Sequence, residues 1–157
     1  AFNIKDKGAI KLLKKIGQPP FKWNELIQQR QLLLKFGGAM YNKTNYNNLI
    51  SKYIYSDEYK FLDLLKFPIG IYFSLKHLWG ELSEMDLTIE VPEVQIPVCF
   101  VLGRHDYQVP SECSMAYFEK LIAPQKRIIW FHKSGHTPMF EEPDKFIEIV
   151  RKEFDQS

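Results

Sequence analysis

Two stretches decide the fold of this chain: residues 97–106, which read PVCFVLGRHD, and residues 127–136, which read RIIWFHKSGH. Each stretch begins with a nearly continuous apolar run and ends in a polar loop. Apolar runs of about six residues, separated by a segment long enough for one helix, are typical of a parallel β-α-β unit. The sequence therefore predicts two parallel strands, each followed by a polar loop.

One residue of a proton-handling pair lies in each loop, Asp106 after the first strand and His136 after the second. Loops that leave the carboxyl ends of parallel strands lie along one edge of the sheet, where ligands bind. Because neighbouring strands are about 4.8 Å apart, Asp106 can accept a hydrogen bond from one imidazole nitrogen. That bond would fix the tautomer and stabilise the imidazolium when the other nitrogen takes a proton. We expect Gly103 and Gly135 to allow the sharp turns that present these side chains.

Helices are predicted after each of the two strands. Pro110-Ser111 begins a helix that extends to about residue 122. Glu142-Pro143 begins a last helix, because proline is tolerated in a first helical turn. Glu141 and Glu142 are expected to set the start of that helix rather than to contact a substrate. Its buried stripe is expected to consist of Phe146, Ile147, Val150 and Phe154.

The first 90 residues read as helical and contain no internal repeat. Apolar periodicity predicts helices over residues 4–16, 24–36, 57–67 and 69–78. Ser56 is expected to cap the third of these helices and Pro68 to end it. The connector at residues 91–97 holds two prolines, and residues that precede proline avoid helical angles. The boundary between a helical part and the β-α-β-α part is therefore placed near residue 90.

Composition bounds the function less tightly. The chain has 157 residues, 15% of them aromatic, and a net charge of +2. So small a charge does not favour nucleic acid or an acidic membrane surface as a partner, and no apolar run approaches the roughly 20 residues of a membrane span. Cys99 and Cys113 do not form a disulfide framework, which favours a reducing compartment, the cytoplasm.

The two loops resemble those of a known superfamily. The stretch from Ile96 to Asp106, followed by Val109-Pro110, is similar to the acid-bearing strand and loop of α/β-hydrolases. SGHTPMFEEP at residues 134–143 is similar to their histidine loop and last helix. The resemblance is nearest to the proline-iminopeptidase-like branch, in which a helical cap precedes these strands. It implies an α/β fold, an incomplete α/β-hydrolase, with a helical cap region at 1–90 and the C-terminal part of the core at 91–157.

The resemblance also implies a nucleophile. Enzymes of this superfamily carry a serine in a Gly-x-Ser-x-Gly elbow, which no stretch of this chain matches; Ser74 and Ser134 lack the flanking glycines. We therefore expect the carboxyl-terminal half of a serine hydrolase that acts on an ester, an amide or an amino-terminal peptide bond. Asp106 and His136 would be two members of its Ser-His-Asp triad. The chain alone would be inactive, and a small molecule or short peptide would be the substrate of the intact parent.

Other interpretations of the same residues stay open. Asp106 could merely cap a turn without pairing with the histidine, and His136 could be a structural loop histidine. A metal site could be drawn from His105, His132, His136 and Cys113, but their spacing does not fit the known ligand patterns. We expect neither a metal nor a cofactor. The superfamily also hosts other reactions on the same acid and histidine.

A non-catalytic module is the alternative function. A two-stranded sheet leaves unpaired edges, and cap helices leave an apolar underside, so self-association is expected of the chain. The tyrosines and phenylalanines of the first 90 residues could line a substrate pocket, although core packing explains them equally well.

Overall fold

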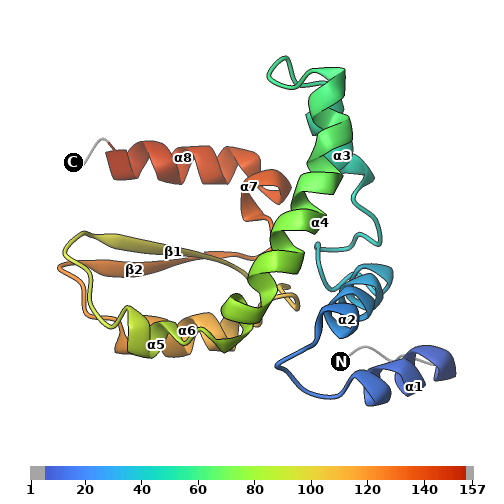
Figure 1. The fold of residues 1–157 in the computed structure, drawn as a ribbon. Helices are drawn as coiled ribbons and strands as arrows, with labels where there is room; N and C mark the ends of the chain where they lie inside the picture. The colour runs from blue at the N-terminus through green and yellow to red at the C-terminus, as the bar shows by residue number, and fades with distance from the viewer. Residues whose placement is uncertain (1–5, 155–157) are drawn as a thin grey trace. The chain divides into compact units, whose positions relative to one another are not determined.

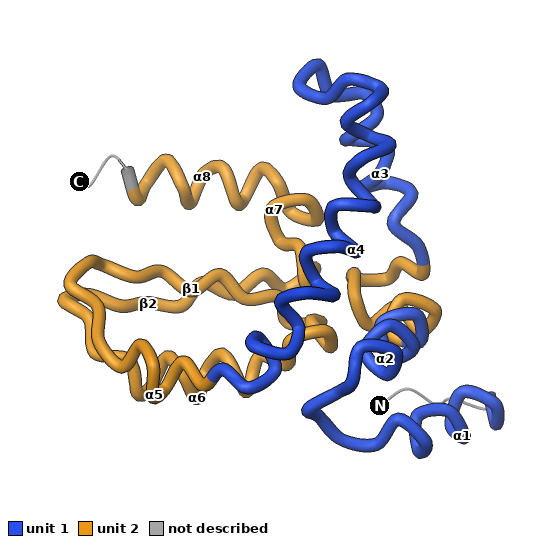
Figure 2. Tube along the Cα trace, viewed as in Figure 1, with its two compact units in different colours: residues 1–32, 45–85 blue, residues 33–44, 86–157 orange. Residues whose placement is uncertain are grey.

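A computed structural model of the protein describes residues 6–154, except for the side chain of Phe154. Ile4 and that side chain, both used in the helix predictions above, lie outside the described residues. The chain separates into two compact units (Figure 2). Unit 1 takes residues up to 32 and residues 45–85, and unit 2 takes residues 33–44 and everything from residue 86 onward. Each unit is described by itself.

Unit 2 contains a parallel two-stranded sheet (Figure 1). Strand β1 (Val98–Gly103) pairs with β2 (Lys126–Phe131), in a register that places Val98 opposite Lys126 and Gly103 opposite Phe131. Helix α6 (Ser111–Lys120) connects them. The predicted β-α-β unit is therefore confirmed. Short helices α5 (Leu87–Glu90) and α7 (Pro138–Glu141) precede and follow this unit, and α8 (Pro143–Phe154) comes last.

Aromatic side chains hold the helices of unit 2 on the sheet. Phe100 of β1 meets Phe118 of α6 edge-on, with ring centroids 5.3 Å apart. Phe131 at the end of β2 is fully buried and faces Phe146 of α8 at 6.4 Å. Because successive residues of a strand point to opposite faces, the sheet is covered by α6 on one face and α8 on the other (Figure 1).

Unit 1 is helical. Helix α1 (Lys7–Ile16) is capped by Asp6, whose carboxylate accepts a hydrogen bond from the backbone N–H of Ala9 at 2.9 Å. It ends at Gly17, where φ is +77°, a conformation that favours glycine. The other helices are α2 (Trp23–Lys35), α3 (Asn47–Ile54) and α4 (Phe61–Glu84). The last residues of α2 lie in unit 2.

The predicted division of residues 56–78 into two helices is wrong. The Ser56 hydroxyl accepts a bond from the N–H of Glu58 in a local turn, so it caps no helix. Helix α4 begins instead at Phe61, where the Asp63 carboxylate accepts a bond from the N–H of Lys60 at 3.1 Å. The helix then continues through Pro68 to Glu84. A proline removes one hydrogen bond from a helix interior. The hydrogen bonds of the turns before and after Pro68 keep the helix continuous. Within residues 6–154, no helix is both long enough and apolar enough to cross a membrane.

Candidate active site

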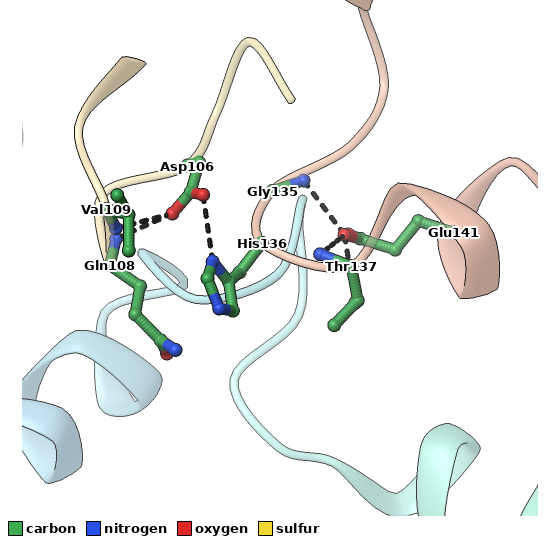
Figure 3. A network of polar contacts seen from close by, with 7 residues as sticks. All are labelled: Asp106, Gln108, Val109, Gly135, His136, Thr137 and Glu141. Carbon is green, nitrogen blue, oxygen red and sulfur yellow. Dashed lines mark hydrogen bonds and ion pairs between the residues drawn. The ribbon is translucent and has the colours of Figure 1, made fainter. Parts of the chain in front are cut away.

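Asp106 uses its two carboxylate oxygens for different tasks (Figure 3). Oδ1 accepts hydrogen bonds from the backbone N–H groups of Gln108 at 2.8 Å and Val109 at 2.9 Å. Oδ2 accepts a hydrogen bond from Nδ1 of His136 at 2.9 Å. The turn-capping role and the pairing with histidine, which the sequence left as alternatives, therefore coexist on one side chain. The two backbone bonds orient the carboxylate and hold its second oxygen toward the imidazole.

The surroundings of the pair are unequal. The Asp106 side chain is 14% exposed and the His136 side chain 37% exposed. A carboxylate only accepts hydrogen bonds, so Nδ1 must carry the proton and Nε2 must hold the free lone pair of the neutral ring. A largely buried acid behind a solvent-accessible imidazole is the arrangement that a general base requires.

Backbone hydrogen bonds join the acid loop to the histidine loop. The N–H of Arg104 donates to the carbonyl of Phe131 at 2.9 Å, and the N–H of His105 donates to the carbonyl of Ser134 at 3.0 Å. These bonds continue the pairing of the two strands beyond their ends. The register of the sheet thus determines the position of Asp106 relative to His136.

Glycine is needed in both loops for space and not for conformational freedom, which corrects the reason given above. Neither Gly103 nor Gly135 has a positive φ. A Cβ on Gly103 would lie 2.0 Å from the carbonyl oxygen of Gly135. A Cβ on Gly135 would lie 2.7 Å from the carbonyl oxygen of Ala39. The backbones approach so closely that no side chain fits between them.

A segment distant in sequence, residues 38–41, completes the site, and sequence reasoning missed it. The carbonyl of Ala39 accepts a hydrogen bond from the N–H of His136 at 2.9 Å, and the carbonyl of Gly38 accepts one from the N–H of Tyr107 at 3.0 Å. Ala39 and Met40 are each only 1% exposed. Gly37 lies just beyond the end of α2 with φ +71°, a conformation that favours glycine.

Glu142 holds the start of the histidine loop. Its Oε1 accepts hydrogen bonds from the hydroxyl of Ser134 at 2.7 Å and from the N–H of Lys133 at 2.9 Å. Burial acts to raise the pKa of the Glu142 carboxyl, but those bonds, with the charges of Lys145 and His132, outweigh it and lower that pKa below its usual value. Because Ser134 is fully buried and its hydroxyl is bonded to Glu142, it does not suit the role of a nucleophile.

The remaining candidate residues are not gathered at one point. The His105 ring packs on the ring of Tyr41, with centroids 4.3 Å apart. His132 and Cys113 are exposed. Among the residues that the structure describes, no group of three or more His, Cys, Asp or Glu side chains could hold a metal ion.

Some of the aromatic residues of unit 1 pack on one another. Tyr53 meets Tyr59 at 5.5 Å and Phe67 at 5.3 Å between ring centroids. An open hollow of about 810 Å³ lies beside them on the surface of unit 1, lined in part by Tyr59, Phe67 and Ile71. Its lining residues all belong to unit 1.

Comparison with known proteins identifies relatives that are longer than this chain. No protein-family profile matches it. A probable aminopeptidase of Bacillus subtilis, YbaC, is 35% identical over 143 residues, which is 90% of this chain and 45% of that protein. An AB hydrolase superfamily protein of the same organism, YclE, is 37% identical over 83 residues, 52% of this chain and 29% of that protein. A proline iminopeptidase of Heyndrickxia coagulans is 30% identical over 71 residues, 45% of this chain and 24% of that protein. This chain thus spans less than half the length of each of these relatives.

A solved structure shares the fold. The esterase EaEST from Exiguobacterium antarcticum superposes with a TM-score of 0.54 at 17% sequence identity. The superposition covers 96% of this chain and 48% of the esterase. At that level of identity the likeness concerns the fold alone. Together with the likeness to YclE, it confirms the predicted incomplete α/β-hydrolase fold.

Proposed function

We propose that this chain, which belongs to the α/β-hydrolase superfamily and resembles its proline-iminopeptidase-like branch, supplies the acid and the base of a serine hydrolase. The observation that carries the proposal is the hydrogen bond of 2.9 Å between His136 Nδ1 and Asp106 Oδ2. It leaves Nε2 as the acceptor on an imidazole that solvent and substrate can reach. Asp106 is the acid that orients this ring.

The pair would handle one proton in each half of the reaction. Nε2 of His136 takes the proton of a serine hydroxyl while the serine oxygen bonds to the substrate's carbonyl carbon. It then gives that proton to the leaving amine or alcohol as the old bond breaks and an acyl-enzyme remains. A water molecule then attacks the acyl-enzyme while Nε2 takes its proton. The proton passes to the serine oxygen as the acyl bond breaks, and the acid product is released. Asp106 stabilises the imidazolium each time it forms.

The nucleophile and the oxyanion hole have to come from outside these 157 residues, because no Gly-x-Ser-x-Gly stretch occurs in them. The bond cleaved would be an ester, an amide or an amino-terminal peptide bond. Relatives whose names denote aminopeptidase and proline iminopeptidase activity support that class. Without the serine, the chain by itself would hold an oriented base and no group for it to activate.

A chimera tests this proposal directly. In YbaC of Bacillus subtilis, the region that matches this chain over 143 residues is replaced by the corresponding residues of this chain. The purified chimera is assayed with p-nitrophenyl acetate and with an amino acid p-nitroanilide. We expect hydrolysis by the chimera, and a loss of about 10³-fold or more in kcat with His136→Ala, as for other triads.

Three results would contradict the proposal. A folded chimera that hydrolyses neither substrate would show that this chain does not supply a working acid and base. A folded chimera that retains its hydrolytic rate after His136→Ala would show that this histidine is not the base. Hydrolysis by the 157-residue chain alone, abolished by His136→Ala, would show that the nucleophile lies within it.

A second candidate function, self-association, is supported by the surface of α4. Large apolar side chains on this helix are strongly exposed, among them Phe61 at 73%, Ile69 at 69% and Phe73 at 61%. Exposed apolar surface of this extent is typical of an interaction site. Sedimentation velocity at increasing concentration should then show dimers or larger species. Ile69→Lys combined with Phe73→Lys should weaken the association, and Ser74→Lys on the same helix is the control. A monomer at all concentrations would exclude this function.

A further inference from the structure

One carboxylate, that of Glu141, accepts hydrogen bonds from both sides of the histidine (Figure 3). Its Oε2 accepts from the backbone N–H of Gly135 at 2.9 Å and from that of Thr137 at 3.2 Å. The hydroxyl of Thr137 adds a third bond to the same oxygen at 3.3 Å. Since Gly135 and Thr137 are the immediate neighbours of His136, this single oxygen holds the backbone before and after the base.

The other oxygen of Glu141 holds the distant segment. Oε1 accepts a hydrogen bond from the N–H of Tyr41 at 2.6 Å, across 100 positions in sequence. In the same segment, residues 38–41, the carbonyl of Ala39 accepts a hydrogen bond from the N–H of His136. The backbone N–H groups of residues 135, 136 and 137 are thus all bonded. Those of 135 and 137 donate to Glu141, and that of 136 donates to the segment 38–41, which Glu141 also holds.

We propose that Glu141 is a positioning residue, which fixes the backbone of His136 so that Nδ1 stays on Asp106. The chemistry of the carboxylate suits this task. Four donors converge on it, and an ionised carboxyl group offers acceptors at both oxygens. A glutamine offers one acceptor, so in either orientation it turns an NH2 group toward the N–H of Tyr41 or toward the donors of the histidine loop. Its importance for catalysis rests on the proposed function, whereas its effect on the geometry of His136 does not.

The test uses Glu141→Gln in the full chain and reads the geometry by NMR. In the wild type we expect a downfield Nδ1–H proton signal from His136 and slow hydrogen exchange at the amides of Gly135 and Thr137. In the variant we expect that signal to be lost and both amides to exchange at least about tenfold faster, because local opening sets the exchange rate. Glu148→Gln is the matched control: it removes the same charge from an exposed side chain whose partner is Lys152, and it should change neither observation.

The outcomes separate positioning from general stability. A folded Glu141→Gln protein that keeps the Nδ1–H signal and the slow amides overturns the proposal. If the variant does not fold, the wild-type protein provides the test. The proposal is overturned if the amides of Gly135 and Thr137 exchange as fast as those of an open loop. It is supported if both amides are protected and the downfield signal is present. A folded but inactive chimera, combined with the expected NMR changes, would refute the hydrolase function and leave the positioning role standing.

Discussion

Gly103→Ala is the substitution for which the structure makes the sharpest prediction. The new Cβ would lie 2.0 Å from the carbonyl oxygen of Gly135 and 2.6 Å from that of Ser134. An ordinary contact begins at 3.4 Å, so the acid loop and the histidine loop must separate by about 1.4 Å if nothing else gives. Both neighbours are backbone atoms that cannot rotate out of the way, unlike the end of a flexible side chain.

That displacement acts directly on the candidate site. If all of it appeared between Asp106 and His136, their contact of 2.9 Å would grow to about 4.3 Å, well beyond a hydrogen bond. The bond between the N–H of His105 and the carbonyl of Ser134 would be strained as well. Overpacking costs about 1–3 kcal/mol, and a lost hydrogen bond adds about 1 kcal/mol. We therefore expect unit 2 to lose about 2–4 kcal/mol of stability.

The assay combines two measurements. Hydrogen exchange of peptides from β1 and β2 reports the stability of unit 2, and the Nδ1–H signal of His136 reports the site. Both should change with Gly103→Ala. Gly80→Ala in α4 is the control, since a Cβ there meets nothing within 4 Å; replacing a helical glycine should stabilise unit 1 by about 0.5–1 kcal/mol. Unchanged exchange in β1 and β2, together with an intact histidine signal in Gly103→Ala, would refute the reasoning.

Three further predictions concern the same two loops. In the active chimera, Asp106→Asn should lower kcat by about 10⁴-fold, because an amide no longer fixes the histidine tautomer; a loss below tenfold would argue against the pair. The pKa of Glu142 is lowered, so its stabilising effect is complete above the ordinary value of 4.5 and is lost as the pH falls through the lowered value. Urea unfolding should therefore show Glu142→Gln to be less stable than wild type at pH 7, with a difference that shrinks as the pH falls below 4.5; a difference that stays the same over this pH range would contradict this. Ser134→Ala leaves the Lys133 bond in place and removes one buried hydroxyl, so it should cost about 1 kcal/mol and leave chimera activity within a few-fold; a loss as large as that of His136→Ala would make Ser134 a reacting group.

The order of elements in unit 2 could be predicted from the sequence because local chemistry determines it. Apolar runs of strand length, a helix-length segment between them and Pro143 in a first helical turn are signals carried by neighbouring residues. They led to the parallel pairing of β1 and β2 that the structure shows. They also placed Asp106 and His136 on adjacent loops, where the structure brings them within 2.9 Å; their catalytic role stays a prediction.

Local signals failed where several of them competed. Ser56 and Pro68 each carry a strong preference, yet α4 begins at Phe61 and continues through Pro68. The capping bond of Asp63, with about two helical turns before the proline and more than four after it, outweighs the one hydrogen bond that proline removes. Intrinsic preference is a weak prior when the rest of a helix opposes it.

The sequence by itself thus determined which two residues could form an acid–base pair and on which kind of sheet edge they lie. Only the tertiary structure decided what holds that pair in place. The carbonyl of Ala39, the carboxylate of Glu141 and the space reserved at Gly103 act through contacts between segments that are far apart along the chain. Such contacts leave no periodic or spacing signal in a single sequence, because they depend on how the backbone of one segment meets another in space.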